Sequence, residues 1–254
     1  MNKKIIFSTF LLTFLFVQAA FAENITLTKN EVLIPQGWSV ADDDLKFKKN
    51  TIAELNHQGE LITGTLNQNT YLRPTGWKNL INDYAYLETN NVFFPRFFRP
   101  INIRNGFAVP TYGHVRYKDN TQVTFAPDGT VLSGTISEKV SLKLQQKSYG
   151  FVDFKSDTEL AFYPNGQIKS GTLATDTKLR PLGWKHIQGT KTLPGFLEFK
   201  SGTKIEFDHD GYVISGTLKE NASWQATTGE TIYLPAKKTI HFMGEEINIY
   251  EEKM

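Results

Sequence analysis

The chain has 254 residues, of which 40% are hydrophobic and 21% charged, and it contains no cysteine. This composition is ordinary for a globular protein and excludes an intrinsically disordered one. The lack of cysteine excludes disulfides, thiolate metal sites, a cysteine nucleophile and a lipid anchor on an N-terminal cysteine.

The N-terminus has the features of a secretory signal peptide, and we expect residues 1–22 to be removed. Two lysines open the chain, the stretch 5–17 is mostly apolar, and Ala20 and Ala22 are the small residues expected before a cleavage point. A helix over this stretch would rise only about 20 Å, too short for a hydrocarbon core of about 30 Å. We therefore expect a periplasmic or secreted protein with no transmembrane segment after cleavage.

Cleavage also changes the charge balance. The removed segment carries two lysines and no acidic residue, so the 28 basic residues fall to 26 and equal the 26 acidic ones. The mature chain is therefore close to neutral, and it has no run of lysine or arginine. We expect no nucleic-acid partner.

Four segments of the mature chain align without gaps over twenty residues, and we expect them to build one domain over 23–254. They are residues 47–66, 117–136, 154–173 and 199–218. Each begins with an aromatic residue, has a threonine four positions later and a glycine at twelve. Each closes on serine or threonine, then glycine, threonine and an aliphatic residue. Four such copies indicate an internal repeat.

Each copy has the pattern of a β-hairpin. In the third copy, Thr158, Leu160 and Phe162 alternate with other residues, as in a half-buried strand, and the stretch 163–166 (Tyr-Pro-Asn-Gly) is typical of a turn. The expected turn glycines are Gly59, Gly129, Gly166 and Gly211. The sequence therefore predicts an all-β fold, an antiparallel meander or solenoid-like array of four hairpin units with at least ten strands.

The strand after each turn contains a second glycine. The apolar phase slips by one residue at these positions, which are Gly64, Gly134, Gly171 and Gly216. A β-bulge or a sharp bend at each glycine would explain the slip.

The residues 162–171 read Phe-Tyr-Pro-Asn-Gly-Gln-Ile-Lys-Ser-Gly and resemble the hairpin repeats of the MORN-variant class. The resemblance covers the four cores, about a third of the chain. It implies an elongated or curled antiparallel sheet and an interaction role without catalysis. The Ser/Thr-Gly-Thr closure is an addition to the pattern of that family.

A second repeated element ends in Gly-Trp. It occurs at 33–38, 72–77 and 179–184, each time before a repeat core. Exposed tryptophans in register could bind a polysaccharide, but rings that recur with a repeat more often pack between units. We therefore expect Trp38, Trp77 and Trp184 to form a core stripe.

The longest insertion, about 78–113, combines aromatic residues with arginines, the residue types that dominate binding hot spots. The expected partner-binding residues are Phe93, Phe94, Arg96, Phe97, Phe98 and Arg99. The alternative is a loop that folds back and caps an open end of the sheet.

The sequence contains no catalytic motif, and we assign no catalytic residue, metal ligand or cofactor. His57 and His209 occupy equivalent turn positions without further ligands at metal spacing, and Asp42–Asp44 lacks the spaced oxygen ligands of a calcium loop. We expect an extracytoplasmic binding or scaffolding protein that engages a protein or a surface polysaccharide. The alternative is an envelope protein that binds polysaccharide or an enzyme that acts on it.

Overall fold

A computed structural model of the protein describes residues 22–39, 44–80, 101–104, 107–110, 113–144, 150–188 and 195–250. The expected signal peptide, apart from Ala22, lies outside these residues, as does most of the long insertion. In the described part the fold is all-β, with one short helix, α1 (Trp77–Leu80), and one 3-10 turn, η1 (Trp184–His186). The expected all-β antiparallel fold is confirmed.

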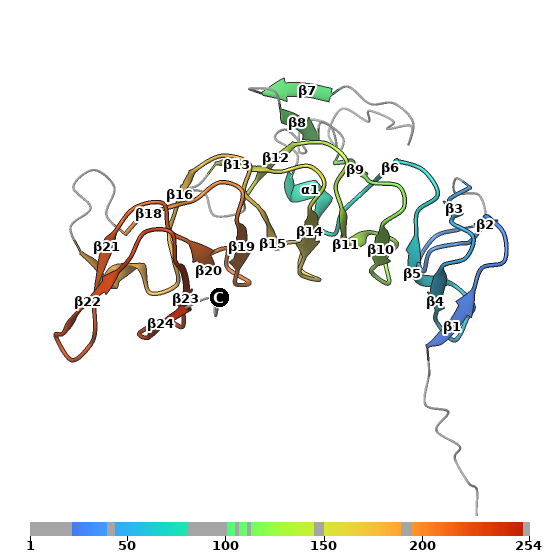
Figure 1. Cartoon of the computed structure of the whole chain (residues 1–254). Helices are drawn as coiled ribbons and strands as arrows, with labels where there is room; N and C mark the ends of the chain where they lie inside the picture. Colours follow the sequence, from blue (N-terminus) through green and yellow to red (C-terminus); the bar gives the residue numbers. More distant parts are fainter. Residues whose placement is uncertain are drawn as a thin grey trace, which may run out of the picture.

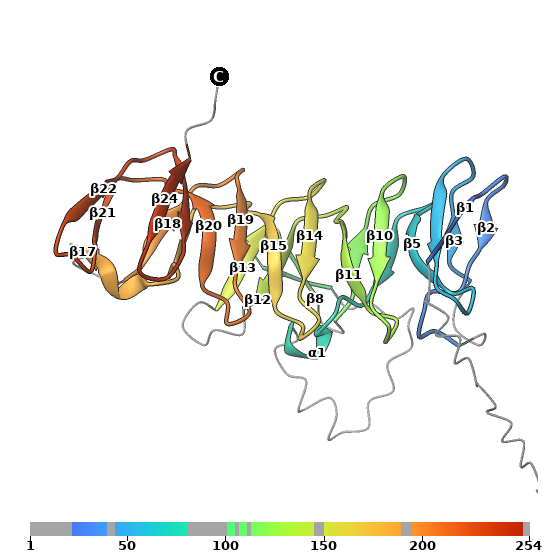
Figure 2. The same cartoon turned by 90° about the horizontal axis from the view of Figure 1, so that it is seen from below.

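One sheet of eleven strands runs through the whole array (Figures 1 and 2). The order is β1-β4-β5-β10-β11-β14-β15-β19-β20-β23-β24, and all neighbours are antiparallel. The strands are β1 (Glu23–Thr26), β4 (Ile52–Leu55), β5 (Leu61–Thr65), β10 (Gln122–Phe125), β11 (Val131–Thr135), β14 (Glu159–Phe162), β15 (Ile168–Thr172), β19 (Lys204–Phe207), β20 (Val213–Thr217), β23 (Thr239–Phe242) and β24 (Ile247–Tyr250). Figure 1 shows an arch with this sheet on its inner side.

Short strands form a second layer on the other side of the sheet (Figure 1). Three two-stranded pieces are β2 (Glu31–Val32) with β3 (Lys46–Phe47), β6 (Thr70–Leu72) with β9 (Val115–Tyr117), and β16 (Thr177–Leu179) with β18 (Leu197–Phe199). A four-stranded piece has the order β13 (Phe151–Phe154), β12 (Val140–Lys143), β8 (Phe107–Pro110), β7 (Ile101–Arg104). A three-stranded piece joins β17 (Ile187–Gln188), β21 (Ala222–Gln225) and β22 (Thr231–Leu234).

The four repeat cores have the same backbone geometry. The leading aromatic residue of each core forms an isolated antiparallel bridge with its closing aliphatic residue; the pairs are Phe47–Leu66, Tyr117–Ile136, Phe154–Leu173 and Phe199–Leu218. The threonine four positions after the aromatic donates its hydroxyl hydrogen to the corner carbonyl, as Thr158 does to Lys155 at 2.6 Å. This bond explains why a threonine recurs there, because it fixes the corner between the two layers.

Two further parts of the array belong to the same fold but do not match the repeated sequence pattern. The backbone N–H groups of Asp157 and Gly202 each donate to the backbone carbonyl of the closing aliphatic residue of the preceding unit. The N–H of Lys237 donates in the same way to the carbonyl of Leu218, at 2.8 Å. Lys237 therefore marks the corner of a fifth hairpin, β23–β24. At the other end, Asn50 donates to Leu27 at 2.6 Å, so β1 is the second strand of an incomplete unit.

The predicted turn glycines are confirmed. Gly59, Gly129, Gly166 and Gly211 lie in the hairpin turns with φ of 80°, 79°, 87° and 85°. Each N–H donates to a carbonyl three residues earlier, for example Gly166 to Tyr163 at 2.8 Å. Glycine adopts this left-handed conformation without the steric cost of a Cβ atom.

The predicted bulges exist, but they do not lie at the second glycine. In the third unit, Ala161 pairs with Ser170 and Phe162 with Ile168, so the extra residue is Lys169, two positions before Gly171. The other three units shift at the same point. The expectation of a bulge at the glycine itself is therefore wrong. The glycine instead makes room for the leading aromatic ring.

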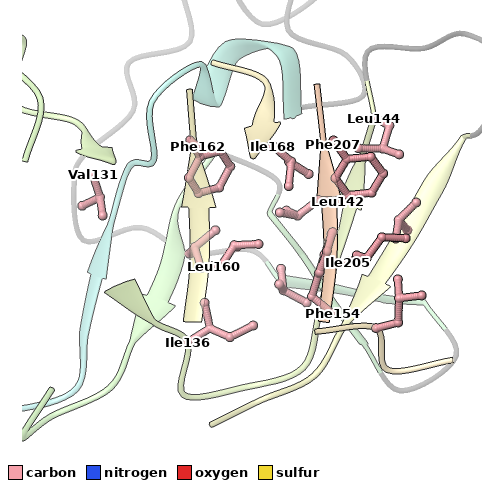
Figure 3. Packing of buried hydrophobic residues seen from close by; sticks show 14 of the residues in the cluster. Val131, Ile136, Leu142, Leu144, Phe154, Leu160, Phe162, Ile168, Ile205 and Phe207 are labelled. Atoms are coloured by element: carbon pink, nitrogen blue, oxygen red, sulfur yellow. The ribbon is translucent and has the colours of Figure 1, made fainter. Parts of the chain in front are cut away.

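The core lies between the two layers. Figure 3 shows Leu160 and Phe162 of β14, Ile205 and Phe207 of β19 and Leu142 of β12 gathered in one cluster. All five are at most 3% exposed. Because the second layer covers this face, the opposite face of the sheet is left open.

Candidate functional site on the open face of the sheet

The residues predicted to bind a partner, Phe93, Phe94, Arg96, Phe97, Phe98 and Arg99, lie outside the described residues. Their role stays a prediction. The structure does describe the base of their insertion. A Cβ atom on Gly113, near its end, would lie 2.6 Å from Cε3 of Trp77, near its start, and the Arg73 guanidinium lies 3.9 Å from the centre of the Trp77 ring.

The same contact between a glycine and a tryptophan, with an arginine over the ring, recurs in the fourth unit. A Cβ atom on Gly195 would lie 2.3 Å from the Trp184 ring, and Arg180 lies 4.2 Å above that ring. Trp38 instead donates its ring N–H to the carbonyl of Gly129 in a neighbouring hairpin turn, at 2.8 Å. All three tryptophans are half-buried, so the expected core stripe is only partly right. The fully buried tryptophan is Trp224, which takes the place of leucine in the other units.

A continuous row of side chains crosses the open face of the sheet. The register of each strand pair places them opposite one another in sequence: Asn24, Glu54, Thr63, Thr124, Ser133, Ala161, Ser170, Glu206, Ser215, His241 and Asn248. Most of these are short and polar, and three of them, Ala161, Ser170 and Ser215, are at most 8% exposed. A sheet face with short side chains offers an even surface on which an elongated partner can lie.

A second row runs beside the first, two residues further along each strand. Its cross-strand pairs are Thr26–Ile52, Thr65–Gln122, Thr135–Glu159, Thr172–Lys204, Thr217–Thr239 and Thr239–Tyr250. The threonines come from the Ser/Thr-Gly-Thr closure of each repeat. Because side chains two apart in a strand share a face, both hydroxyl residues of this closure point to the open side.

A shallow groove of about 280 Å³ lies on this face between the third and fourth hairpins. Its lining residues are Glu159, Ala161, Tyr163, Lys169, Ser170, Lys204, Glu206, Phe207 and Ile214. Lys204 forms an ion pair with Glu206 at 2.6 Å. The groove therefore offers donors and acceptors of both charges in a small area.

Tyr163 closes one end of the groove. Its hydroxyl donates to the carbonyl of Phe207 at 2.8 Å, and its ring lies 3.8 Å from that of His209. Burial raises the pKa of the Tyr163 phenol, and the carboxylates of Asp208 and Glu206 raise it further. The phenol therefore remains protonated at neutral pH and acts as a hydrogen-bond donor that ties two hairpins together.

His209 thus contacts a tyrosine rather than further metal ligands. In the ranges that the structure describes, no group of three or more His, Asp or Glu side chains is placed to hold a metal ion. Asp42 and Asp43 lie outside those ranges. Within the same ranges, no helix is long and apolar enough to cross a membrane.

Comparisons with known proteins give no relative. No protein-family model matches the chain, and neither the curated proteins nor the solved structures that were searched yield a match. The resemblance to MORN-variant hairpins therefore remains a hypothesis carried by the repeated motif.

Proposed function

We propose that this chain is an exported, non-enzymatic binding or scaffolding protein that holds an elongated partner across the open face of the eleven-stranded sheet. The observation that supports this role is the row of eleven side chains from Asn24 to Asn248. Eleven strands at a spacing of about 4.8 Å give a face roughly 48 Å long. Repeat surfaces of this kind bind by area and shape rather than through a deep pocket.

The groove favours binding over catalysis. Two of its polar groups already have partners, since Lys204 pairs with Glu206 and the Tyr163 hydroxyl is bonded to a backbone carbonyl. An enzyme acting on polysaccharide would need two carboxylates aimed at one bond. Glu159 and Glu206 lie on strands separated by β15 and in different rows of the face.

The test is retention of insoluble envelope polysaccharide, and of envelope proteins, prepared from the cells that make the protein. Thr135→Gln and Thr172→Gln together place two longer neutral side chains in the second row and should weaken retention at least tenfold. Thr228→Gln, in an exposed turn of the second layer, is the matched control and should bind like the natural protein. Equal retention by all three proteins, or release of soluble fragments from the polysaccharide, would contradict the proposal.

Export is part of the proposal, and it has its own test. N-terminal sequencing of the protein recovered from periplasmic and culture fractions should give Glu23 as the first residue. Recovery of the intact chain, beginning with Met1, in the cytoplasmic fraction would contradict it.

A second candidate surface is the insertion around Phe93–Arg99. Of residues 90–104 the structure describes only 101–104, which form β7, the outermost strand of the four-stranded piece of the second layer and not a member of the eleven-stranded sheet. Deleting them should therefore leave the main sheet folded, as judged by its circular dichroism, while abolishing partner retention. Unfolding on deletion would identify the segment as a structural cap.

A further inference from the structure

Four lysines occupy equivalent corners of the array, one after each leading aromatic residue. Their backbone N–H groups donate to a threonine carbonyl of the same unit at 2.8–2.9 Å; the lysines are Lys48, Lys118, Lys155 and Lys200. Successive units are two strands apart, so these positions recur about every 9.5 Å. They follow the rim of the open face, because the first strand of each hairpin begins just after them.

The ammonium groups of the first two lysines have a side-chain acceptor in the next unit. Lys48 donates to the side-chain oxygen of Asn120, and Lys118 forms an ion pair with Asp157. In both cases the acceptor is the next unit's residue with positive φ at the corner. The ion pair raises the pKa of Lys118 and lowers the pKa of Asp157.

The next two lysines have no such acceptor. The equivalent corner residues of the following units are Gly202 and Lys237, neither of which can accept a hydrogen bond from an ammonium group through its side chain. Lys155 and Lys200 are both exposed. Asp157, two residues after Lys155, forms its ion pair with Lys118.

The fifth hairpin adds two more cations where the fold would favour other residues. Lys237 has a φ of 62°, and the equivalent residues are Asn50, Asn120, Asp157 and Gly202, the types that tolerate this conformation. Lys238 stands where a threonine hydroxyl holds the corner carbonyl in the four other units. A strained residue that local folding does not require indicates a functional role.

We propose that Lys155, Lys200, Lys237 and Lys238 form a cationic ladder that binds an acidic polysaccharide along the rim of the open face. This proposal specifies the partner of the binding role proposed above, and it therefore rests on that role. Ammonium groups on flexible stems act as point charges and suit carboxylate or sulfate groups carried on a flexible polymer. A glycan with one acidic group on every second ring has charges at a spacing comparable to the distance of about 9.5 Å between the positions of Lys155 and Lys200.

A nucleic acid fits this ladder poorly. Each strand of a duplex carries one charge for about every 3.4 Å of helix axis, so most phosphates between two lysines about 9.5 Å apart would find no partner. The mature chain, which is close to neutral, also lacks the broad positive field that nucleic-acid binding needs.

The test uses the full mature protein on three immobilised polymers, namely polyuronate, sulfated heparin and neutral dextran, with duplex DNA as a fourth. Lys237→Asn restores the residue type of the equivalent corners, and Gly202→Asp gives Lys155 the acceptor that Asp157 gives Lys118. Each should weaken binding to the acidic glycans about threefold or more, and both together at least tenfold, with a shallower salt dependence. Lys46→Asn removes an equal charge from an exposed site in the second layer and should have no effect.

The melting temperature distinguishes a loss of binding caused by the missing lysine from one caused by a folding defect. Lys237→Asn should leave the melting temperature unchanged or raise it, because asparagine tolerates the left-handed conformation better. The proposal is overturned by no retention on either acidic glycan, by an equal loss for Lys46→Asn, or by tighter binding to DNA than to the glycans. If the ladder variants bind normally and the Thr135→Gln/Thr172→Gln protein does not, the ladder is wrong and the open-face proposal stands. Preference for polyuronate or heparin then identifies carboxylate or sulfate as the recognised group.

Discussion

Gly171 lies directly against the ring of Phe154. A Cβ atom on the glycine would stand 2.5 Å from Cδ1 of the phenylalanine, closer than two carbon atoms can approach without displacement. The same contact joins the second glycine of each core to its leading aromatic residue, with distances of 2.8, 2.7 and 2.7 Å in the other units. The ring itself is completely buried. This packing, rather than turn geometry, explains the glycine of the Ser/Thr-Gly-Thr closure.

The first prediction follows from this contact. Gly171→Ala should lower the free energy of unfolding by about 1–3 kcal/mol, because a buried ring must move to admit the methyl group. Urea denaturation of the purified protein measures this change. Gly202→Asn is the matched control, since it lies in open space at a corner where two other units have asparagine, and it should cost little. A Gly171→Ala protein as stable as the natural one would show that the ring has room to shift.

The second prediction separates backbone strain from steric contact at the hairpin turns. Gly59 and Gly166 have similar positive φ, but a Cβ atom on Gly59 would meet nothing within 4 Å, whereas one on Gly166 would lie 2.4 Å from Cα of Gly76. Alanine at either position should cost about 1–2 kcal/mol for the left-handed conformation. Gly166→Ala should cost at least 1 kcal/mol more for the contact. Equal losses for the two variants in chemical denaturation would show that the turn of the third hairpin moves away from Gly76.

The sequence was sufficient to predict the hairpins, because their signals are local. Strand alternation and a turn glycine such as Gly166 lie within ten residues of one another, and the short-range backbone preferences decide them. The fifth hairpin was missed since Lys238 replaces the threonine of the other units, and since its turn is one residue shorter, so that its glycine, Gly244, is out of register with the other turn glycines. The incomplete first unit was missed because only its second strand and closing Leu27 remain.

The open face could be predicted only in part. The parity of Ser170 and Thr172 shows that they share a face, but which face is covered depends on strands of the second layer that are distant in sequence. The role of Gly171 was misassigned for the same reason, because its partner Phe154 lies seventeen residues earlier. The ladder required the structure, since the partner of each lysine belongs to the next unit.

The third prediction concerns the one leading aromatic residue that carries a hydroxyl group. Tyr117 is fully buried, and its hydroxyl has no hydrogen-bond partner among the described residues. Burial raises the pKa of its phenol, so the group stays neutral. Tyr117→Phe removes an unsatisfied polar atom and should raise the free energy of unfolding by about 1 kcal/mol. Phe154→Tyr, the reverse change in the third unit, should lower it. Loss of stability in Tyr117→Phe would reveal a partner such as a buried water molecule.

The fourth prediction concerns acid stability and the carboxylate of Asp176. It accepts the backbone N–H of Ser201 at 2.7 Å and an ion pair from Lys219 at 3.0 Å, and together these bonds lower its pKa to about 2. The equivalent corners of three other units are held by Asn30, Asn69 and Asn221 through the same backbone bond. Asparagine can therefore do the structural task of Asp176 without a charge.

Because the folded pKa of Asp176 lies below the unfolded value of about 3.9, its contribution is complete above that pH. It is lost as the pH falls from about 4 to about 2. Asp176→Asn should therefore flatten the dependence of the melting temperature on pH in this window while leaving the fold intact at pH 7. Asn69→Asp should steepen it, since the new carboxylate would accept the N–H of Asp119. Melting curves recorded between pH 2 and pH 7 measure this dependence. If the melting temperature of Asp176→Asn falls with pH as steeply as that of the natural protein, other carboxylates cause the acid sensitivity.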